Sequence, residues 1–126
     1  MKYLGIDYGD KRVGIAVSDE EGKLAFPYKV IGNSDKLVRE ILEILDKEKA
    51  ETVVVGESLD FAGKPNEVMK NIKVFVEKLK AENKTKVVYE PEFLTSVQAE
   101  RITGKNDMHD ASAAAIILQS FLDKSR

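Results

Sequence analysis

The chain contains no cysteine, and this absence removes several kinds of chemistry at once. Disulfide bonds, thiolate nucleophiles and cysteine-based zinc or iron–sulfur sites are all excluded. Long apolar runs are missing too. Asp7 interrupts the first one, so no secretory signal core forms, and no stretch approaches the roughly 18 residues of a membrane span. We therefore expect a cytoplasmic protein without membrane contact.

An excess of charge of one sign is also missing. The 20 Lys and Arg residues nearly balance the 22 Asp and Glu residues, which gives a formal charge of −2. This balance disfavours a protein that coats nucleic acid by bulk positive charge, so phosphate binding must come from local patches or metal ions. Because 43% of the 126 residues are hydrophobic, the chain can build one compact core. We expect a single domain over residues 1–126.

Apolar patterning predicts strands that alternate with helices. Three apolar stretches between turn signals predict an antiparallel meander of strands over Tyr3–Asp7, Arg12–Ser18 and Leu24–Ile31. The later elements are predicted as a helix over Asp35–Glu48, a strand over Thr52–Gly56, a helix from Pro65 to Asn83, a strand over Val87–Tyr89, a helix from Thr95 to Ile102 and a helix from Met108 to Lys124. This order predicts an α/β fold, with a mixed five-stranded sheet flanked by helices on both faces.

Three carboxylates stand at the ends of predicted elements. Asp7 closes the first strand, Glu92 follows the last strand, and Asp110 lies in the first turn of the final helix. Ligands of α/β sheets bind at the carboxyl ends of parallel strands. If the first strand lies beside the fourth, the three acids converge at one edge and offer the oxygen ligands that Mg²⁺ prefers. Two such ions about 3.5–4 Å apart would stabilise a phosphodiester displacement.

Each acid also has a plainer interpretation. Asp110 could simply be an acid favoured by the partial positive charge at a helix N-terminus, and Glu92 could be a solvated loop residue. Asp7 is harder to explain as surface decoration, because it interrupts an apolar strand between Ile6 and Tyr8.

Four separated blocks, in the same order, resemble a known family. They are GIDYG with KRVGIAVS (5–9 and 11–18), VVVG (53–56), EFLTSVQAER (92–101), and DASAA with IIL (110–114 and 116–118). These blocks resemble the YqgF/RuvX family of bacterial Holliday junction resolvases, which have an RNase H-like fold. The resemblance spans nearly the whole chain.

The resemblance implies a metal-dependent nuclease that acts on structured nucleic acid. Its substrate would be either branched DNA, in Holliday junction resolution, or RNA, in pre-16S rRNA processing. The acidic triad of the family falls on Asp7, Glu92 and Asp110, which would be both the catalytic residues and the ligands of Mg²⁺ or Mn²⁺, with a metal-activated water as nucleophile. A resolvase usually works as a homodimer, whereas an end-trimming ribonuclease can be a monomer.

Basic residues near these acids are candidates for substrate binding. Arg12 is the strongest, because the family motif includes it and its guanidinium can hold a phosphate bidentately. Lys11, Lys64 and Lys105 are the others, and the alternative interpretation of each is ordinary surface charge in a lysine-rich chain. His109, the only histidine, adjoins Asp110, but we interpret it as incidental because neighbours on a helix face apart.

The chain departs from the family pattern at four places around the predicted site. Asp10 stands where the family has a hydroxyl residue, and Pro91 stands where it has an acid. The loop over 56–60 carries extra negative charge, and the segment before Asp110 is short, with Lys105 nearly its only basic residue.

Two alternatives follow from these observations. The departures favour a nucleic-acid-binding module of the same RNase H-like fold without catalysis. The GIDYG motif alone, which actin-like ATPases and sugar kinases share, would suggest a phosphate-loop ATPase. The 126 residues lack the second domain that closes such nucleotide sites, so this alternative is the weaker one.

Overall fold

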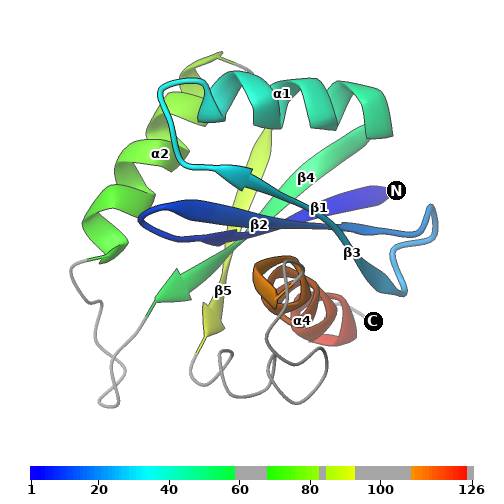
Figure 1. Ribbon diagram of the computed structural model, residues 1–126. Coiled ribbons are helices and arrows are strands. Elements are labelled where there is room, and N and C mark those ends of the chain that lie inside the picture. The colour runs from blue at the N-terminus through cyan, green and yellow to red at the C-terminus, as the bar shows by residue number, and fades with distance from the viewer. Residues whose placement is uncertain (59–67, 83–84, 93–108, 125–126) are drawn as a thin grey trace.

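Five strands form one twisted sheet in the computed structural model, which describes residues 1–58, 68–82, 85–92 and 109–124 (Figure 1). The strands are β1 (Lys2–Tyr8), β2 (Arg12–Ser18), β3 (Ala25–Gly32), β4 (Ala50–Ser58) and β5 (Lys86–Glu92). Their order is β3-β2-β1-β4-β5. The first three strands pair antiparallel, while β4 is parallel to both β1 and β5. The predicted mixed sheet with a meander is confirmed. The order also meets the condition for convergence of the three acids, because β1 lies beside β4 at the centre of the sheet.

Helices cover both faces of this sheet, as predicted. The helices α1 (Leu37–Glu48) and α2 (Val68–Glu82) lie on one face, and α4 (His109–Lys124) lies on the other (Figure 1). The helix predicted over 95–102 falls outside the described residues. None of the helices in the described part of the chain is long and apolar enough to cross a membrane.

Two strands extend further than their apolar pattern indicates. The pairing of β4 with β5 continues through Glu57↔Pro91 to Ser58↔Glu92. Glu92 is therefore the last residue of β5, and its placement in a loop after the strand was wrong. The apolar run stops at Tyr89, but the two strands continue to pair when their side chains become polar, so hydropathy alone misses the last residues.

The face under α1 and α2 carries the larger apolar core. Alternate residues of the central strands point to this side and meet apolar residues of both helices, because side chains of a strand alternate between faces. The buried members include Leu4, Ile6, Val13, Ile15, Val53 and Val55 from the sheet, Ile41 and Leu45 from α1, and Ile72, Phe75, Val76 and Leu79 from α2.

Helix α4 lies very close to β1. A Cβ atom added at Gly5 would stand 2.8 Å from the Cβ atom of Leu118 and 3.0 Å from the carbonyl oxygen of Ala114. One step back along β1, the Tyr3 ring lies 5.7 Å from the ring of Phe121. The contacts progress along α4 as they go back along β1, so the two elements run in opposite directions. The small residues at this contact, Gly5 in β1 and Ala114 in α4, allow the close approach.

Candidate active site

Asp7 lies near the carboxyl end of the central strand, on the side of the sheet that α4 covers. Leu4 and Ile6 belong to the core under α1 and α2, whereas Gly5 faces α4. By the alternation of a strand, Asp7 shares the side of Gly5. Its side chain is half-buried. The Asp7 carboxylate is thus the one member of the predicted triad whose side chain the structure describes.

Glycines flank Asp7 on the neighbouring strands. On β2 its partner is Gly14. On β4 the pair Ile6↔Val55 places Gly56 next in register. Neither glycine places a side chain beside the carboxylate, and a glycine within a strand often marks a place where a ligand or another backbone approaches closely.

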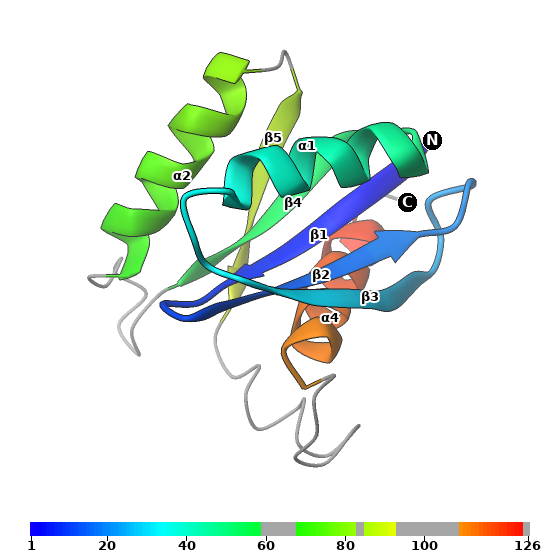
Figure 2. The ribbon, with the colours of Figure 1, turned by 45° about the horizontal axis from the view of Figure 1, so that its top comes forward.

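Helix α4 brings position 110 to the same end of the sheet. Ala114 contacts the Gly5 position, and the helix and β1 run in opposite directions. Asp110 lies one turn before Ala114, and Asp7 lies two residues after Gly5, so both continue toward the carboxyl end of β1. Figure 2 shows the start of α4 at this end. The side chains of Asp110 and His109 lie outside the described residues.

Glu92 ends β5 at the same edge. The pairs Ile6↔Val55 and Val55↔Tyr89 align β1, β4 and β5, and Glu92 lies three residues beyond Tyr89. The structure describes its backbone and not its side chain. Within the described side chains, no three acids or histidines cluster closely enough to hold a metal ion. The full triad of Asp7, Glu92 and Asp110 therefore stays a prediction.

Two of the predicted basic residues lie at the turn between β1 and β2. Lys11 is in the turn and Arg12 is the first residue of β2; both are exposed, and Lys64 and Lys105 lie outside the described residues. The turn is fixed from the side of α1 by Asn33. Its side-chain amide donates a hydrogen bond to the Gly9 carbonyl over 2.8 Å, and its backbone N–H donates to the Lys11 carbonyl over 2.9 Å. These bonds hold the turn that leads from Asp7 to Arg12.

Ser112 presents a polar atom without a partner close to the start of α4. Its side chain is only 2% exposed, and its hydroxyl oxygen makes no hydrogen bond within the described part of the chain. A buried hydroxyl without a partner costs roughly 1–3 kcal/mol, so it marks a place where packing alone does not explain the residue.

Glu90 is a buried acid on the same side of the sheet. It is 3% exposed, and its Oε2 atom accepts hydrogen bonds of 2.7 Å from the Ser120 hydroxyl and from the Lys124 ammonium. These bonds tie β5 to the second half of α4. Glu90 is therefore fully engaged in holding the helix on the sheet.

Carboxylates also lie near β5 on the other face of the sheet, which α2 covers. Burial raises the pKa of the Tyr89 phenol, and the charges of Glu77 and Glu57 raise it further. Because negative charge disfavours a phenolate, the shift reports a negative potential at the α2 side of β5.

Sequence reasoning missed three of these residues. Glu90 lies two residues after Val88 and therefore on the same face of β5, so strict strand alternation could have placed it against α4. Asn33 and Ser112 give no such signal, because the partner of the first and the lack of a partner for the second depend on contacts between distant parts of the chain.

The chain is similar in sequence to proteins of one family. Residues 1–124 match the model of a family described as "RuvX: Holliday junction resolvase". A protein of Nitratidesulfovibrio vulgaris strain Miyazaki F, named "Putative pre-16S rRNA nuclease", is 38% identical over 98% of this chain and 85% of its own length. A relative of the same name from Oleidesulfovibrio alaskensis is 36% identical over 98% and 92%.

Solved structures share the fold. Thermus thermophilus RuvC in complex with a Holliday junction substrate superposes with a TM-score of 0.62 at 20% identity, covering 99% of this chain and 96% of that one. The Fowlpox virus resolvase in complex with Holliday junction DNA superposes with a TM-score of 0.63 at 12% identity, covering 99% of both chains. The RNase H-like architecture predicted from the sequence is confirmed.

Proposed function

This chain belongs to the RuvX family of nucleases, and on that premise we propose that it hydrolyses phosphodiester bonds of structured precursor RNA at the Asp7 edge of its sheet, with a divalent cation. Its relatives at 36–38% identity carry the name of a pre-16S rRNA nuclease. That similarity favours an RNA substrate of the same class.

One observation supports the location of the site above all others. Asp7 is an acid at the carboxyl end of the central strand, half-buried and flanked on β2 by Gly14. An acid there interrupts an otherwise apolar strand at some cost to folding. The placement is understandable if the carboxylate has a ligand to bind.

The donor chemistry of this edge fits a hard divalent cation. Asp7 supplies carboxylate oxygens, which Mg²⁺ and Mn²⁺ prefer, and the chain has no cysteine to favour a softer metal. Glu92 and Asp110 would complete the ligand set, since β5 and α4 end and begin at this edge. A bound cation there would neutralise charge on the phosphate and make water a stronger nucleophile.

The residues of the chain have separate tasks in this proposal. The Asp7 carboxylate orients the reacting groups from a strand that is paired on both sides, so its position is fixed by the sheet. Lys11, exposed in the turn after β1, and Arg12, exposed at the start of β2, hold the phosphates that flank the cleaved bond. The hydrogen bonds from Asn33 keep that turn in place.

The test compares cleavage of two end-labelled substrates, a structured RNA that carries a 16S precursor end and a four-way DNA junction. Each is incubated with Mg²⁺, Mn²⁺ or EDTA. We expect RNA cleavage that requires a metal and that falls more than about 100-fold in Asp110→Asn, because even outer-shell partners of metal ligands are worth about 10–100-fold.

The matched control is Asp123→Asn, at the other end of the same helix. Asp123 accepts a hydrogen bond from Gln119 at 3.0 Å, which the exchange allows Asn to keep. Loss of cleavage in Asp110→Asn but not in Asp123→Asn supports the proposed site. Cleavage that survives EDTA or Asp110→Asn would contradict it, and binding of both substrates without any cleavage would favour a non-catalytic module.

The DNA junction is the second candidate substrate, because the matching family model is described as that of a Holliday junction resolvase. Cutting of the junction with no cutting of the RNA would favour that candidate. A resolvase would also cut two strands symmetrically and act as a dimer, so sedimentation of the protein with the junction would distinguish one copy from two.

A further inference from the structure

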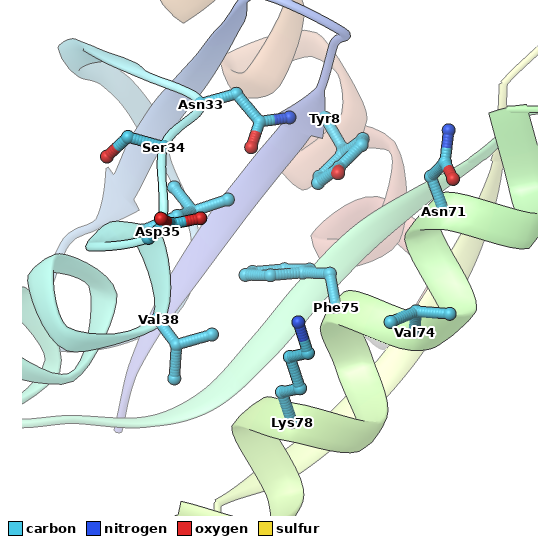
Figure 3. Close-up of a pocket in the computed structure, with 10 residues that line it drawn as sticks. Tyr8, Asn33, Ser34, Asp35, Val38, Asn71, Val74, Phe75 and Lys78 are labelled. Atoms are coloured by element: carbon cyan, nitrogen blue, oxygen red, sulfur yellow. The ribbon is translucent and has the colours of Figure 1, made fainter.

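A pocket of about 290 Å³ opens between α1 and α2, on the face of the sheet opposite Asp7. Figure 3 shows its walls: Asn33, Ser34 and Asp35 come from the segment before α1, and Asn71, Val74 and Lys78 come from α2. Tyr8 and Phe75 lie between these walls. Nothing in the site described above uses this pocket.

Two aromatic rings form the apolar part of the pocket. The Tyr8 and Phe75 rings are 5.4 Å apart between centroids and are inclined by 38°. Phe75 is 4% exposed and belongs to the core, whereas Tyr8 is half-buried and Val74 is 54% exposed. An exposed valine beside a partly open tyrosine leaves apolar surface that a flat ring can cover.

The polar groups around the rings can form hydrogen bonds with a base and an ion pair with a phosphate. The Asn33 side chain uses one N–H on the Gly9 carbonyl, which leaves its oxygen and second N–H for a ligand. Asn71 offers a second amide, and Asp35 offers an acceptor for base amino groups or ribose hydroxyls. The Lys78 ammonium points toward Phe75 in Figure 3, where it can pair with a phosphate.

The pocket adjoins the proposed site through the backbone. Tyr8 directly follows Asp7, and Asn33 hydrogen-bonds the turn that carries Lys11. Asp7 and Tyr8 thus lie at the same end of β1, on opposite faces of the sheet. A second hollow of about 430 Å³ shares Asp35 and Lys78 with the first and extends it along α1 and α2.

We propose that this pocket binds one nucleotide of the substrate strand, outside the cleaved bond, with its base against Tyr8 and Val74 and its phosphate at Lys78. The proposal rests on the proposed function, because it assumes a nucleic-acid strand at the Asp7 edge. It gives the protein a preference for substrates with an unpaired nucleotide next to the cleavage position, since a stacked and paired base cannot enter.

Binding is tested without any cleavage, so its failure is distinct from failure of the proposed function. The backbone amides of ¹⁵N-labelled protein are followed by NMR during titration with AMP, GMP, CMP and UMP. Ribose 5-phosphate and inorganic phosphate serve as probes that lack a base. We expect the amides of Asn71, Val74 and Lys78 to shift with at least one mononucleotide, and to shift much less with the probes without a base.

Two variants test whether the pocket serves the substrate strand. Lys78→Glu reverses the charge at the pocket, and Val74→Glu places a carboxylate where the base would lie. Lys73→Glu is the matched control, since Lys73 is exposed on the same helix and does not line the pocket. With a substrate that has an unpaired flanking nucleotide, both pocket variants are expected to raise KM about tenfold, equal to the loss of one phosphate or stacking contact, with kcat unchanged.

Each outcome decides the proposal. Mononucleotide shifts together with a KM effect in Lys78→Glu and Val74→Glu, but not in Lys73→Glu, support it. Absence of shifts, or equal shifts with ribose 5-phosphate, overturns base recognition. Shifts without any KM effect would make the ligand a free nucleotide and overturn the role in substrate binding. If no nucleic acid is cleaved, the same variants are compared by the Kd of the labelled strand.

Discussion

The two faces of the sheet are built differently. Under α1 and α2, large aliphatic residues and Phe75 form a continuous core with the sheet. Under α4, the contact relies on small residues, with Gly5 against Ala114 and Leu118. The first face is thus stabilised by the burial of apolar area. On the second face, small residues let the helix backbone approach the strand closely.

Polar groups follow the same division. In the described part of the chain, the buried polar or charged residues are Ser18, Thr52, Glu90 and Ser112. Strand alternation or helix contact places all four on the α4 side, as it does Asp7. The α1–α2 face thus provides the stability that allows the other face to hold polar groups near the proposed site.

The largest effect on stability is expected on the apolar face. Ile72→Ala in α2 removes a side chain that is 1% exposed and leaves a cavity, so the free energy of unfolding should fall by about 2–5 kcal/mol. Urea denaturation measures this loss. Val74→Ala, two residues further along the same helix, changes a side chain that is 54% exposed. It should change the free energy of unfolding by less than about 0.5 kcal/mol. Similar losses in both variants would contradict the assignment of this core.

The next largest effect on stability is expected where α4 packs on β1. Gly5→Ala adds a methyl group where the backbone of Ala114 and the Cβ atom of Leu118 leave no space, so it should destabilise the protein by about 1–3 kcal/mol. Gly32→Ala is the control, because nothing lies within 4 Å of an added Cβ atom there. Urea midpoints that fall equally in both variants would show that α4 does not press on β1.

Two serines of α4 should respond with opposite signs. Ser112→Ala removes an unpaired buried hydroxyl and improves helix propensity, so we expect a gain of about 0.5–1 kcal/mol. Ser120→Ala deletes a hydrogen bond to buried Glu90 and should cost about 1–2 kcal/mol. Thermal unfolding of the two variants measures both changes. A loss in Ser112→Ala would mean that its hydroxyl has a partner in solution.

The smallest effect depends on pH and concerns the apolar face. Hydrogen bonds from Lys2 and from the Tyr28 hydroxyl lower the pKa of the Glu48 carboxyl below its usual 4.5. A carboxyl with a lowered pKa stabilises the fold above its unfolded pKa, and this contribution is lost as pH falls through the folded pKa.

Glu48→Gln should therefore cost about 1 kcal/mol or less at pH 7, and its difference from the natural protein should shrink below pH 4.5. Urea denaturation at pH 7, 5 and 3.5 checks this. A difference that stays constant across the range would show that the ion pair with Lys2 contributes nothing through charge.

Much of the fold could be predicted from the sequence, because apolar runs and helical spacing report burial directly. The meander and the helices on two faces follow from that pattern, whereas the central place of β1 entered only as a condition that the strand order then met. The ends of β4 and β5 could not, since pairing at Ser58↔Glu92 involves polar residues. Asp7 was predicted at the end of the first strand because it interrupts an apolar run, and in the structure it lies near the end of β1 on the side facing α4.

Other parts of the site depend on contacts that no local pattern encodes. Asn33 fixes the β1–β2 turn from 24 residues away, and Ser112 differs from its alanine neighbours by a buried hydroxyl that has no partner among the described residues. The roles of Glu92, Asp110 and Lys105 stay predictions, because they rest on the family resemblance and on the positions of β5 and α4.

The most direct test of the division between the faces measures stability and cleavage in the same preparation of Asp7→Asn. The control is Asp46→Asn, an exposed acid of α1 on the opposite face. We predict that both variants unfold in urea within about 0.5 kcal/mol of the natural protein, and that only Asp7→Asn loses metal-dependent cleavage, by more than about 100-fold. Cleavage by folded Asp7→Asn at the natural rate would contradict the account.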